Sequence, residues 1–392
     1  MDGQRDTAVR WVTASLLILI AGYAMCNNSM SVLMSRIVED FSLAGARQGM
    51  MNSALNFGSI AAILLVPALQ GRVKKSDMLI ASALIQTIML AITGLSPSFF
   101  PLLIACVFMG VGRGWADNYI NSSIVDIHRE NSAKYMGLLH GCYGIGSIFT
   151  PLMLQGLVFL GGWRGAYLSA TGVMAIIAIQ YVWVYRQNKN VFSSTINAEK
   201  KLNFEQVGQH LSDRQSLLIV FCAFLFVAGQ SSLLSWLVHY MRTRYQAEAL
   251  GAICVSIYWA CATLSRFIAP HIRIASLRLI CVSTLIAAAA HTVGVLSGNS
   301  TVMLIMTAIN GLACGHGLPM LIHVGVSRHP GNTSMATSVI ILSSKTAMMV
   351  TPLLVGYLFA ISADVGMLLS SASHLAMVAL TACMFLREEK NA

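Results

Sequence analysis

The sequence predicts an all-α membrane protein with twelve transmembrane helices in two pseudo-symmetric six-helix bundles. Hydrophobic residues make up 56% of the 392 residues, and charged residues only 10%. Soluble domains carry about 25% charged residues, so this chain has too few charges for a water-facing surface. Apolar segments of about 20 residues, enough to span a bilayer as a helix, recur along the whole sequence. Runs of this length are too long for barrel strands, which leaves helices as the spanning elements.

Apolar runs define the predicted helices in order. The first begins at Trp11 and continues to Met34, and the Cys26-Asn27-Asn28 run inside it lacks the small residues of a signal-peptide cleavage site. We therefore expect a spanning helix there and no cleavable signal. The predicted helices lie near residues 11–34, 48–69, 78–94, 99–120, 135–160, 166–184, 217–240, 250–269, 279–296, 302–324, 336–360 and 365–386.

A polar stretch separates two sets of six predicted helices. We expect an N-terminal bundle over 1–185, a cytoplasmic central loop over 186–214 and a C-terminal bundle over 215–392. At one constant offset the first half also repeats in the second. The matching pairs are Gly110/Gly311, Gly114/Gly315, Val125/Val326, His128/His329, Asn131/Asn332 and the Thr-Pro-Leu runs at 150–152 and 351–353. Parallel repeats of this kind are typical of alternating-access transporters.

The charge distribution predicts topology and excludes other functions. The net charge of +10 comes from basic residues scattered over short loops, which is typical of membrane topology and not of a nucleic-acid surface. Most of them face the cytoplasm if both termini are cytoplasmic. The nine cysteines have no metal-ligand spacing, and no nucleotide-binding glycine loop is present. We expect no enzyme activity, no cofactor and no metal.

Several motifs resemble those of a known family. They are the segment 110–121 with sequence GVGRGWADNYIN, the segment 136–140 with sequence MGLLH, Gly144 and Gly146, and in the second half Gln230, Trp236, Tyr240, Tyr258 and Arg266. With the six-plus-six architecture, they resemble the major facilitator superfamily, and within it the fucose–proton symporter group and its relatives. The resemblance covers nearly the whole chain and implies a secondary active transporter that works by alternating access.

Two positions depart from the pattern of that family. The loop 71–75, with sequence GRVKK, has Lys75 at about the place where the superfamily signature carries an acidic residue. Gln230 stands where many relatives carry a glutamate. These departures bear on the sugar–proton mechanism that the resemblance implies.

Asp117 is the only carboxylate well inside a predicted helix. Arg113 precedes it by four residues and Asn121 follows it by four, so all three share one helical face. Intramembrane ionisable residues commonly mark ion or substrate pathways. We predict that Asp117 carries the proton and that Arg113 is its partner or a substrate ligand. The alternative is a permanent ion pair that only fixes this helix.

Lys345 and Arg266 are the other basic residues within predicted helices. An excess of positive charge along a transport pathway favours an anionic solute, and Lys345 is predicted to bind it. The alternatives for Lys345 are a pairing with Asp117 or a side chain that reaches the membrane interface. Arg266 is predicted to act in gating, by holding loop carbonyls.

A set of polar side chains within the helices is predicted to contact the solute. Amide, hydroxyl and indole groups can bind hydroxylated solutes, or they can simply link helices at about 0.6 kcal/mol per hydrogen bond. The predicted ligands, besides Arg113, Asn121 and Lys345, are Asn27, Asn28, Asn56, His140, Gln230, Trp236, Tyr258 and Asn310, within a wider polar set that includes Asn52, Tyr143 and His316.

These features predict proton-coupled symport of a small polar or anionic organic solute: a sugar, a sugar acid or a carboxylate. A proton-driven exporter of drugs or metabolites is the alternative, and a receptor without transport activity is a third hypothesis. The expected partners are the solute, protons and the lipid bilayer, with no nucleic acid. We expect a monomer in the bacterial cytoplasmic (inner) membrane.

Overall fold

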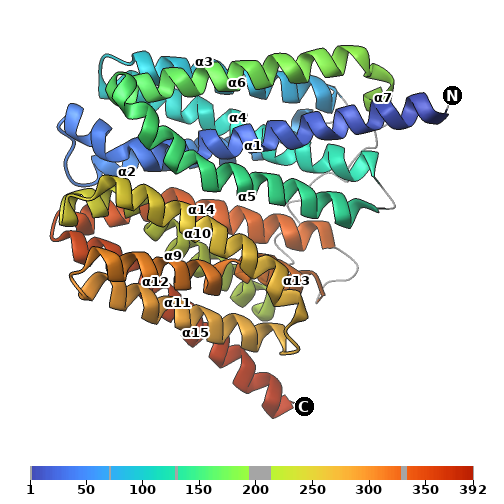
Figure 1. The fold of residues 1–392 in the computed structure, drawn as a ribbon. Helices are drawn as coiled ribbons and strands as arrows, with labels where there is room; N and C mark the ends of the chain where they lie inside the picture. Colours follow the sequence, from blue (N-terminus) through green and yellow to red (C-terminus); the bar gives the residue numbers. More distant parts are fainter. Residues whose placement is uncertain (1, 70–71, 129–130, 194–212, 328–332, 392) are drawn as a thin grey trace. The chain divides into compact units, whose positions relative to one another are not determined.

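The structure is a computed structural model that describes residues 2–69, 72–128, 131–193, 213–327 and 333–391. These residues form helices joined by short turns, and no strand occurs among them (Figure 1). Twelve helical segments of the described chain are long and apolar enough to cross a bilayer, as the sequence predicts. The repeat positions His329 and Asn332 lie outside the described residues.

The helices fall into two groups along the chain. The first group is α1 (Asp2–Asp40), α2 (Arg47–Leu69), α3 (Lys75–Leu95), α4 (Phe99–Ile127), α5 (Ser132–Leu157), η2 (Val158–Leu160), α6 (Gly162–Gln187) and α7 (Lys189–Ser193). The second is α9 (Arg214–Tyr245), α10 (Glu248–Ile268), η3 (Ala269–His271), α11 (Ser276–Leu296), α12 (Ser300–Cys314), α13 (Gly317–Ser327), α14 (Thr333–Phe359) and α15 (Ala363–Asn391).

One predicted helix is interrupted, and several are longer than predicted. The sequence predicts one helix over 302–324, but α12 ends at Cys314 and α13 begins at Gly317. At the ends, α1 continues through polar residues to Asp40. Hydropathy marks only the apolar part of a helix, whereas the backbone can continue as helix into the polar region outside the hydrocarbon core.

The chain divides into two compact units. Unit 1 contains residues Met1–Ile37 and Ala54–Lys201, and unit 2 contains Val38–Ser53 and Leu202–Ala392. Residues 38–53 therefore group with the second unit, although the sequence places them in the N-terminal bundle. The predicted central loop 186–214 begins within α6, and its part 194–212 lies outside the described residues.

Glycines bring α2 and α4 of unit 1 into backbone contact. A Cβ atom added at Gly110 would lie 1.9 Å from the carbonyl oxygen of Leu55, and one at Gly114 would lie 2.6 Å from that of Ser59. No side chain fits at either position without a shift of the backbone. This contact fixes the position of α4 along α2.

Unit 2 repeats the same packing with the matching glycines. A Cβ atom at Gly311 would lie 2.6 Å from the carbonyl oxygen of Tyr258, and one at Gly315 would lie 2.2 Å from that of Ala262. Here α12 contacts α10 as α4 contacts α2. The repeat read from the sequence is therefore a repeat of backbone packing.

The repeated Thr-Pro pair also has one local structure in both units. Pro151 lies inside α5 and Pro352 inside α14, where proline cannot donate the usual helical hydrogen bond. In each case the preceding threonine bonds a carbonyl four residues earlier. Thr150 Oγ1 donates to Gly146 O at 2.6 Å, and Thr351 Oγ1 donates to Ala347 O at 2.8 Å. Each threonine thus adds a hydrogen bond to the turn that the proline weakens.

An ion pair joins α3 and α4 at one end of unit 1. Lys75 Nζ lies 3.0 Å from Asp126 Oδ2, and the two side chains are 19% and 17% exposed. Lys75 occupies the loop position at which the resembling family carries an acidic residue. In this chain the residue at that position is a cation, Lys75, and its partner is the Asp126 carboxylate on α4.

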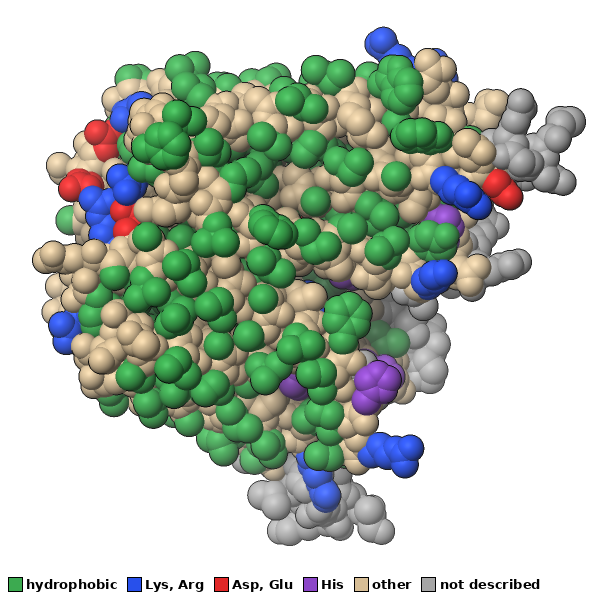
Figure 2. All heavy atoms as spheres, viewed as in Figure 1, with side chains coloured by type: hydrophobic (Ala, Val, Ile, Leu, Met, Phe, Trp, Pro, Cys, Tyr) green, Lys and Arg blue, Asp and Glu red, His purple; other side chains and the backbone are tan. Residues whose placement is uncertain are grey.

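Apolar side chains cover the sides of the helices. Phe100, Ile176 and Leu296 are each exposed by at least two thirds, whereas in the visible face Lys, Arg, Asp and Glu gather near helix ends (Figure 2). Large apolar exposure of this extent is costly in water and is favourable in contact with lipid. The distribution agrees with helices that span a membrane.

We predict that Gly110→Ala destabilises the protein. The added methyl group would overlap the Leu55 carbonyl, and overpacking costs about 1–3 kcal/mol. The control is Gly172→Ala, because a Cβ atom at Gly172 meets no atom within 4 Å and alanine favours the helix by about 1 kcal/mol. Thermal denaturation in detergent should give a lower Tm for Gly110→Ala and an equal or higher Tm for the control. Equal Tm values for Gly110→Ala and the wild type would contradict the backbone contact.

We also predict coupling between Lys75 and Asp126. Lys75→Asp or Asp126→Lys alone should lower the Tm, because each places like charges at 3.0 Å. The double exchange restores opposite charges and should recover most of the loss, with a coupling energy of about 0.5–3 kcal/mol. Additive losses in the double variant would show that the pair contributes nothing to stability.

Candidate functional site

The central part of α4 carries an ion pair in apolar surroundings. Arg113 Nε lies 3.8 Å from Asp117 Oδ2, and the two side chains are 10% and 28% exposed. Arg113 Nε is buried and makes no hydrogen bond among the described residues. At 3.8 Å the contact is ionic and too long for a hydrogen bond. From the exposed fractions, the Asp117 side chain is partly accessible, whereas the Arg113 side chain lies deeper in unit 1.

Asn121 lies one turn beyond Asp117 on the same face of α4. Its Nδ2 donates to the backbone oxygen of Asp117, and its Oδ1 is buried without a hydrogen-bond partner in the described part of the chain. The amide thus carries a buried, unsatisfied acceptor on the same helical face as the ion pair. The predicted face of Arg113, Asp117 and Asn121 is present in the structure.

Two asparagines of α1 bond to α5 within unit 1. Asn27 Nδ2 donates to Tyr143 Oη at 3.3 Å, and Asn28 Nδ2 donates to Ser147 Oγ at 3.2 Å. Gly146 allows the close approach, since a Cβ atom there would lie 2.7 Å from the Ala21 carbonyl oxygen. Both asparagines are half-buried, so their amides are held in position and partly accessible.

The other predicted ligands of unit 1 differ in exposure. Asn56 on α2 is 5% exposed, and its Oδ1 has no hydrogen bond among the described residues. His140 on α5 is exposed. The structure thus places Asn56 in the interior of unit 1 and His140 at its surface.

In unit 2 the amide of Gln230 bonds to a buried tyrosine. Gln230 Nε2 donates to Tyr258 Oη at 2.7 Å, which links α9 to α10. Tyr258 is fully buried and Gln230 is half-buried. The amide is therefore the accessible member of this pair.

Two predicted solute ligands of unit 2 lie in its core. Trp236 is 0% exposed and packs on Phe359 and His239, with ring centroids 4.9 and 5.6 Å away. Asn310 is also 0% exposed and donates from Nδ2 to the Ala287 backbone oxygen at 2.9 Å. The geometry favours the helix-linking alternative for Asn310, which bonds α12 to α11. Trp236 packs in the core, and its Nε1 makes no hydrogen bond among the described residues.

Arg266 bonds to the interruption between α12 and α13. Its Nε donates to the Gly315 backbone oxygen at 3.0 Å. A helix end inside the membrane leaves carbonyl groups without helical partners, and a guanidinium can satisfy one of them. This contact corresponds to the predicted role in holding carbonyls, while a gating role stays a prediction.

His316 lies in the same interruption, and the sequence alone does not distinguish it from the other residues of the wider polar set. Its Nδ1 lies 2.8 Å from Ser265 Oγ, and its Nε2 lies 3.2 Å from Ser283 Oγ. These contacts tie the interruption to α10 and α11. The Gly-His-Gly run 315–317 is the sequence signal that indicates a flexible backbone at this point.

Lys345 lies half-buried in the middle of α14. The neighbouring hydroxyls bond to carbonyl oxygens, with Ser343 Oγ donating to Val220 O at 2.9 Å and Ser344 Oγ donating to Ile340 O at 2.9 Å. The two serines are therefore used in packing α14. Lys345 therefore places a positive charge near the middle of α14.

His128, just beyond the end of α4, lies outside the spanning segments. Its ring stacks on Tyr135 with centroids 3.4 Å apart, and its Nε2 lies 2.7 Å from Thr13 Oγ1. Partial burial lowers the pKa of His128 below its usual 6.5, so the neutral ring is favoured at neutral pH.

Within the described residues no group of three His, Cys, Asp or Glu side chains has the arrangement of a metal site.

Comparisons with known proteins identify the family. The sequence profile of the Major Facilitator Superfamily matches residues 16–274. The chain is 19% identical over 218 residues to the glucose/mannose transporter GlcP of Bacillus subtilis (strain 168), covering 54% of this chain and 53% of that protein. It is 22% identical over 264 residues to a probable L-galactonate transporter of Escherichia coli (strain K12), covering 62% of this chain and 58% of that protein. The matches thus span little more than half the length of these relatives.

Solved structures share the fold over nearly the whole chain. A bacterial homologue of the human lysosomal transporter Spinster, in an inward-facing and occupied conformation, gives a TM-score of 0.75 at 16% identity, covering 97% of both chains. The nucleoside transporter NupG gives 0.74 at 12% identity, covering 95% of this chain and 99% of that one. FucP in the outward conformation gives 0.63 at 15% identity, covering 94% and 97%. These likenesses agree with the twelve-helix fold, and the profile match over residues 16–274 shows that this chain belongs to the Major Facilitator Superfamily of membrane transporters.

Proposed function

We propose that this chain is a secondary active transporter that couples movement of a small anionic or polar organic solute to a proton by alternating access. The observation that carries the proposal is the Arg113–Asp117 pair, which combines a buried guanidinium with a partly accessible carboxylate. The transporter family supports solute transport in general. The Arg113–Asp117 pair supports the further proposal that this transport is coupled to protons.

The pair offers a direct route to coupling. While Asp117 is ionised, it neutralises Arg113. Protonation of Asp117 removes its charge, and a lone charge at the bilayer centre costs about 2.5–3.5 kcal/mol on insertion scales. An anionic solute that binds Arg113 offsets this cost. A proton on Asp117 and an anion on Arg113 therefore favour each other's binding, as symport requires.

The partly accessible amides supply contacts for hydroxyl groups. Asn27 and Asn28 in unit 1 and Gln230 in unit 2 are held in place by hydroxyl partners and keep hydrogen-bonding capacity. Lys345 provides a second cationic group. Two relatives are described as carrying glucose and mannose or L-galactonate, which supports a sugar or sugar acid as the solute class for this chain.

Topology and direction complete the proposal. On the charge bias of the loops we place both termini in the cytoplasm. We also propose that the chain is a monomer in a bacterial inner membrane. A symporter moves its solute in the same direction as the protons, so protons that enter the cell drive import of the solute. A proton-driven exporter would instead accumulate solute when protons move in the opposite direction, so transport in proteoliposomes distinguishes the two.

We predict that Asp117→Asn abolishes proton-driven accumulation. Proteoliposomes would be tested with radiolabelled L-galactonate and glucose under an imposed pH gradient. The asparagine variant should lose the gradient-dependent uptake, because it cannot change charge, and should still exchange labelled for unlabelled solute. The matched control is Asp126→Asn on the same helix, which should retain gradient dependence. Undiminished gradient dependence in Asp117→Asn would sink the proposal.

A second prediction concerns the charge of the solute. Lys345→Ala should raise the KM for L-galactonate at least tenfold, because one charge-assisted contact is worth about 1.5–3 kcal/mol. The KM for a neutral sugar should change little. Lys74→Ala, an exposed lysine before α3, serves as the control for general loss of positive charge. An unchanged KM for the acidic solute would remove Lys345 from the proposed site.

A further inference from the structure

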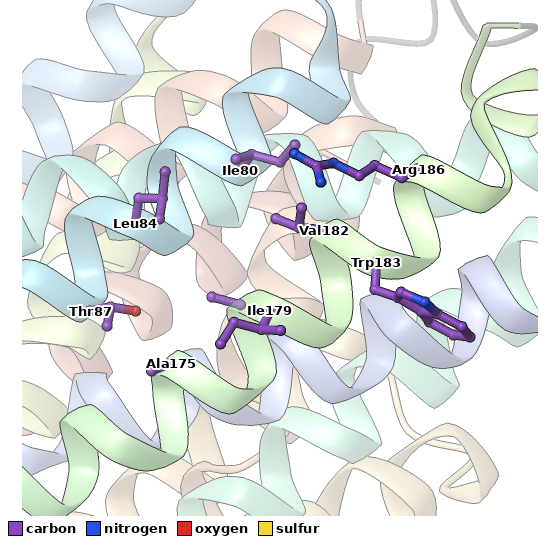
Figure 3. A pocket seen from close by; sticks show the side chains of 9 residues that line it. Ile80, Leu84, Thr87, Ala175, Ile179, Val182, Trp183 and Arg186 are labelled. Carbon is purple, nitrogen blue, oxygen red and sulfur yellow. The ribbon is translucent and has the colours of Figure 1, made fainter.

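A groove lies between α3 and α6 on the surface of unit 1. Its volume is about 470 Å³, and Figure 3 shows its lining side chains. Its walls come from Ile80, Leu84 and Thr87 on α3 and from Ala175, Ile179 and Val182 on α6. None of these residues belongs to the proposed solute site. The groove is therefore a separate feature of the molecule.

The groove suits an apolar occupant. Leu84 and Ile179 are 50% and 69% exposed, so its rim faces the surroundings of the helices. The hydroxyl of Thr87 is already used, since its Oγ1 donates to the Ala83 backbone oxygen at 2.8 Å. Apart from the acceptor capacity of this hydroxyl, the walls from Ile80, Leu84, Ala175, Ile179 and Val182 are apolar and suit a sugar poorly. Ala175, with its small side chain, leaves the space that the groove occupies.

One end of the groove is cationic and interfacial in character. Trp183 and Arg186 line this end, and the Arg186 side chain extends along it toward Ile80 (Figure 3). Trp183 is 57% exposed. Tryptophan concentrates at the level of lipid headgroups, and long basic side chains direct their charge toward that level.

The charges at this end favour an anion. Exposed basic residues near the ends of α3 and α6 are Arg72, Lys74, Arg186 and Lys189. The exposed acidic residue there is Asp77, whose Oδ1 accepts a hydrogen bond from Tyr185 Oη at 3.1 Å. Lys75 is already paired with Asp126. Positive charge thus exceeds negative charge where an acyl chain in the groove would meet its headgroup.

We propose that this groove is a binding site for an anionic phospholipid. One acyl chain lies along the wall between α3 and α6, and the phosphate contacts Arg186. Any lipid can cover an apolar surface in a bilayer. The distinguishing property of this site is a preference for an anionic headgroup, which comes from the guanidinium at its end.

The first experiment measures headgroup preference. Purified full-length protein would be equilibrated with equal amounts of phosphatidylglycerol and phosphatidylcholine in detergent, and bound lipid counted by native mass spectrometry. The wild type should retain phosphatidylglycerol preferentially. Arg186→Gln should reduce that preference about fivefold, the effect of one basic residue near a membrane surface. Arg10→Gln removes the same charge from exposed Arg10 on α1 and should leave the preference unchanged.

A second variant tests the acyl-chain part of the site. Ala175→Phe fills the groove and should reduce retention of both lipids, whereas Val173→Phe enlarges an exposed residue of α6 outside the lining and should not. An Arg186→Gln protein with the wild-type headgroup preference would overturn the proposal. So would lipid retention by a folded Ala175→Phe protein equal to that of Val173→Phe.

Discussion

The electrostatic balance between Arg113 and Asp117 is the constraint on which this account depends. Both residues lie on α4, a helix that is otherwise apolar through its middle, and each stabilises the charge of the other. Arg113 is nearly buried, so its charge must always have a partner. Asp117 is that partner when ionised, and an anion can replace it when it is protonated. The chemistry of the proposed transport cycle follows from this exchange of partners.

Close backbone packing positions this pair. The carbonyls of α2 lie against Gly110 and Gly114, so α4 has little freedom to slide or rotate. Unit 2 uses Gly311 and Gly315 in the same way, but its equivalent helix ends at Cys314 and is interrupted at residues 315–316. Arg266 and His316 secure that interruption. The duplicated scaffold thus carries an ion pair in one half and a broken helix in the other.

Local properties could be predicted from the sequence, and contacts between distant segments could not. The twelve spans follow from hydropathy, and the Arg113–Asp117 pair follows from a four-residue helical spacing. The break at 315–316 has a local signal in its Gly-His-Gly run, but the Arg266 side chain that bonds to it comes from another helix. Lys75 and Asp126 lie far apart in the sequence, so their ion pair required the packing of α3 on α4. Burial of Trp236 and Asn310 likewise depends on neighbouring helices, and it separates these residues from the accessible amides of Asn27, Asn28 and Gln230.

Proton uptake on solute binding tests the central claim most directly. Binding of L-galactonate to purified protein can be measured by calorimetry in buffers with different ionisation enthalpies. The buffer dependence then gives the number of protons taken up. If the account is correct, the wild type takes up a proton when the acid binds, and the Asp117→Asn protein binds it with no proton uptake. Binding without proton uptake in the wild type, or the same uptake in both proteins, would contradict it.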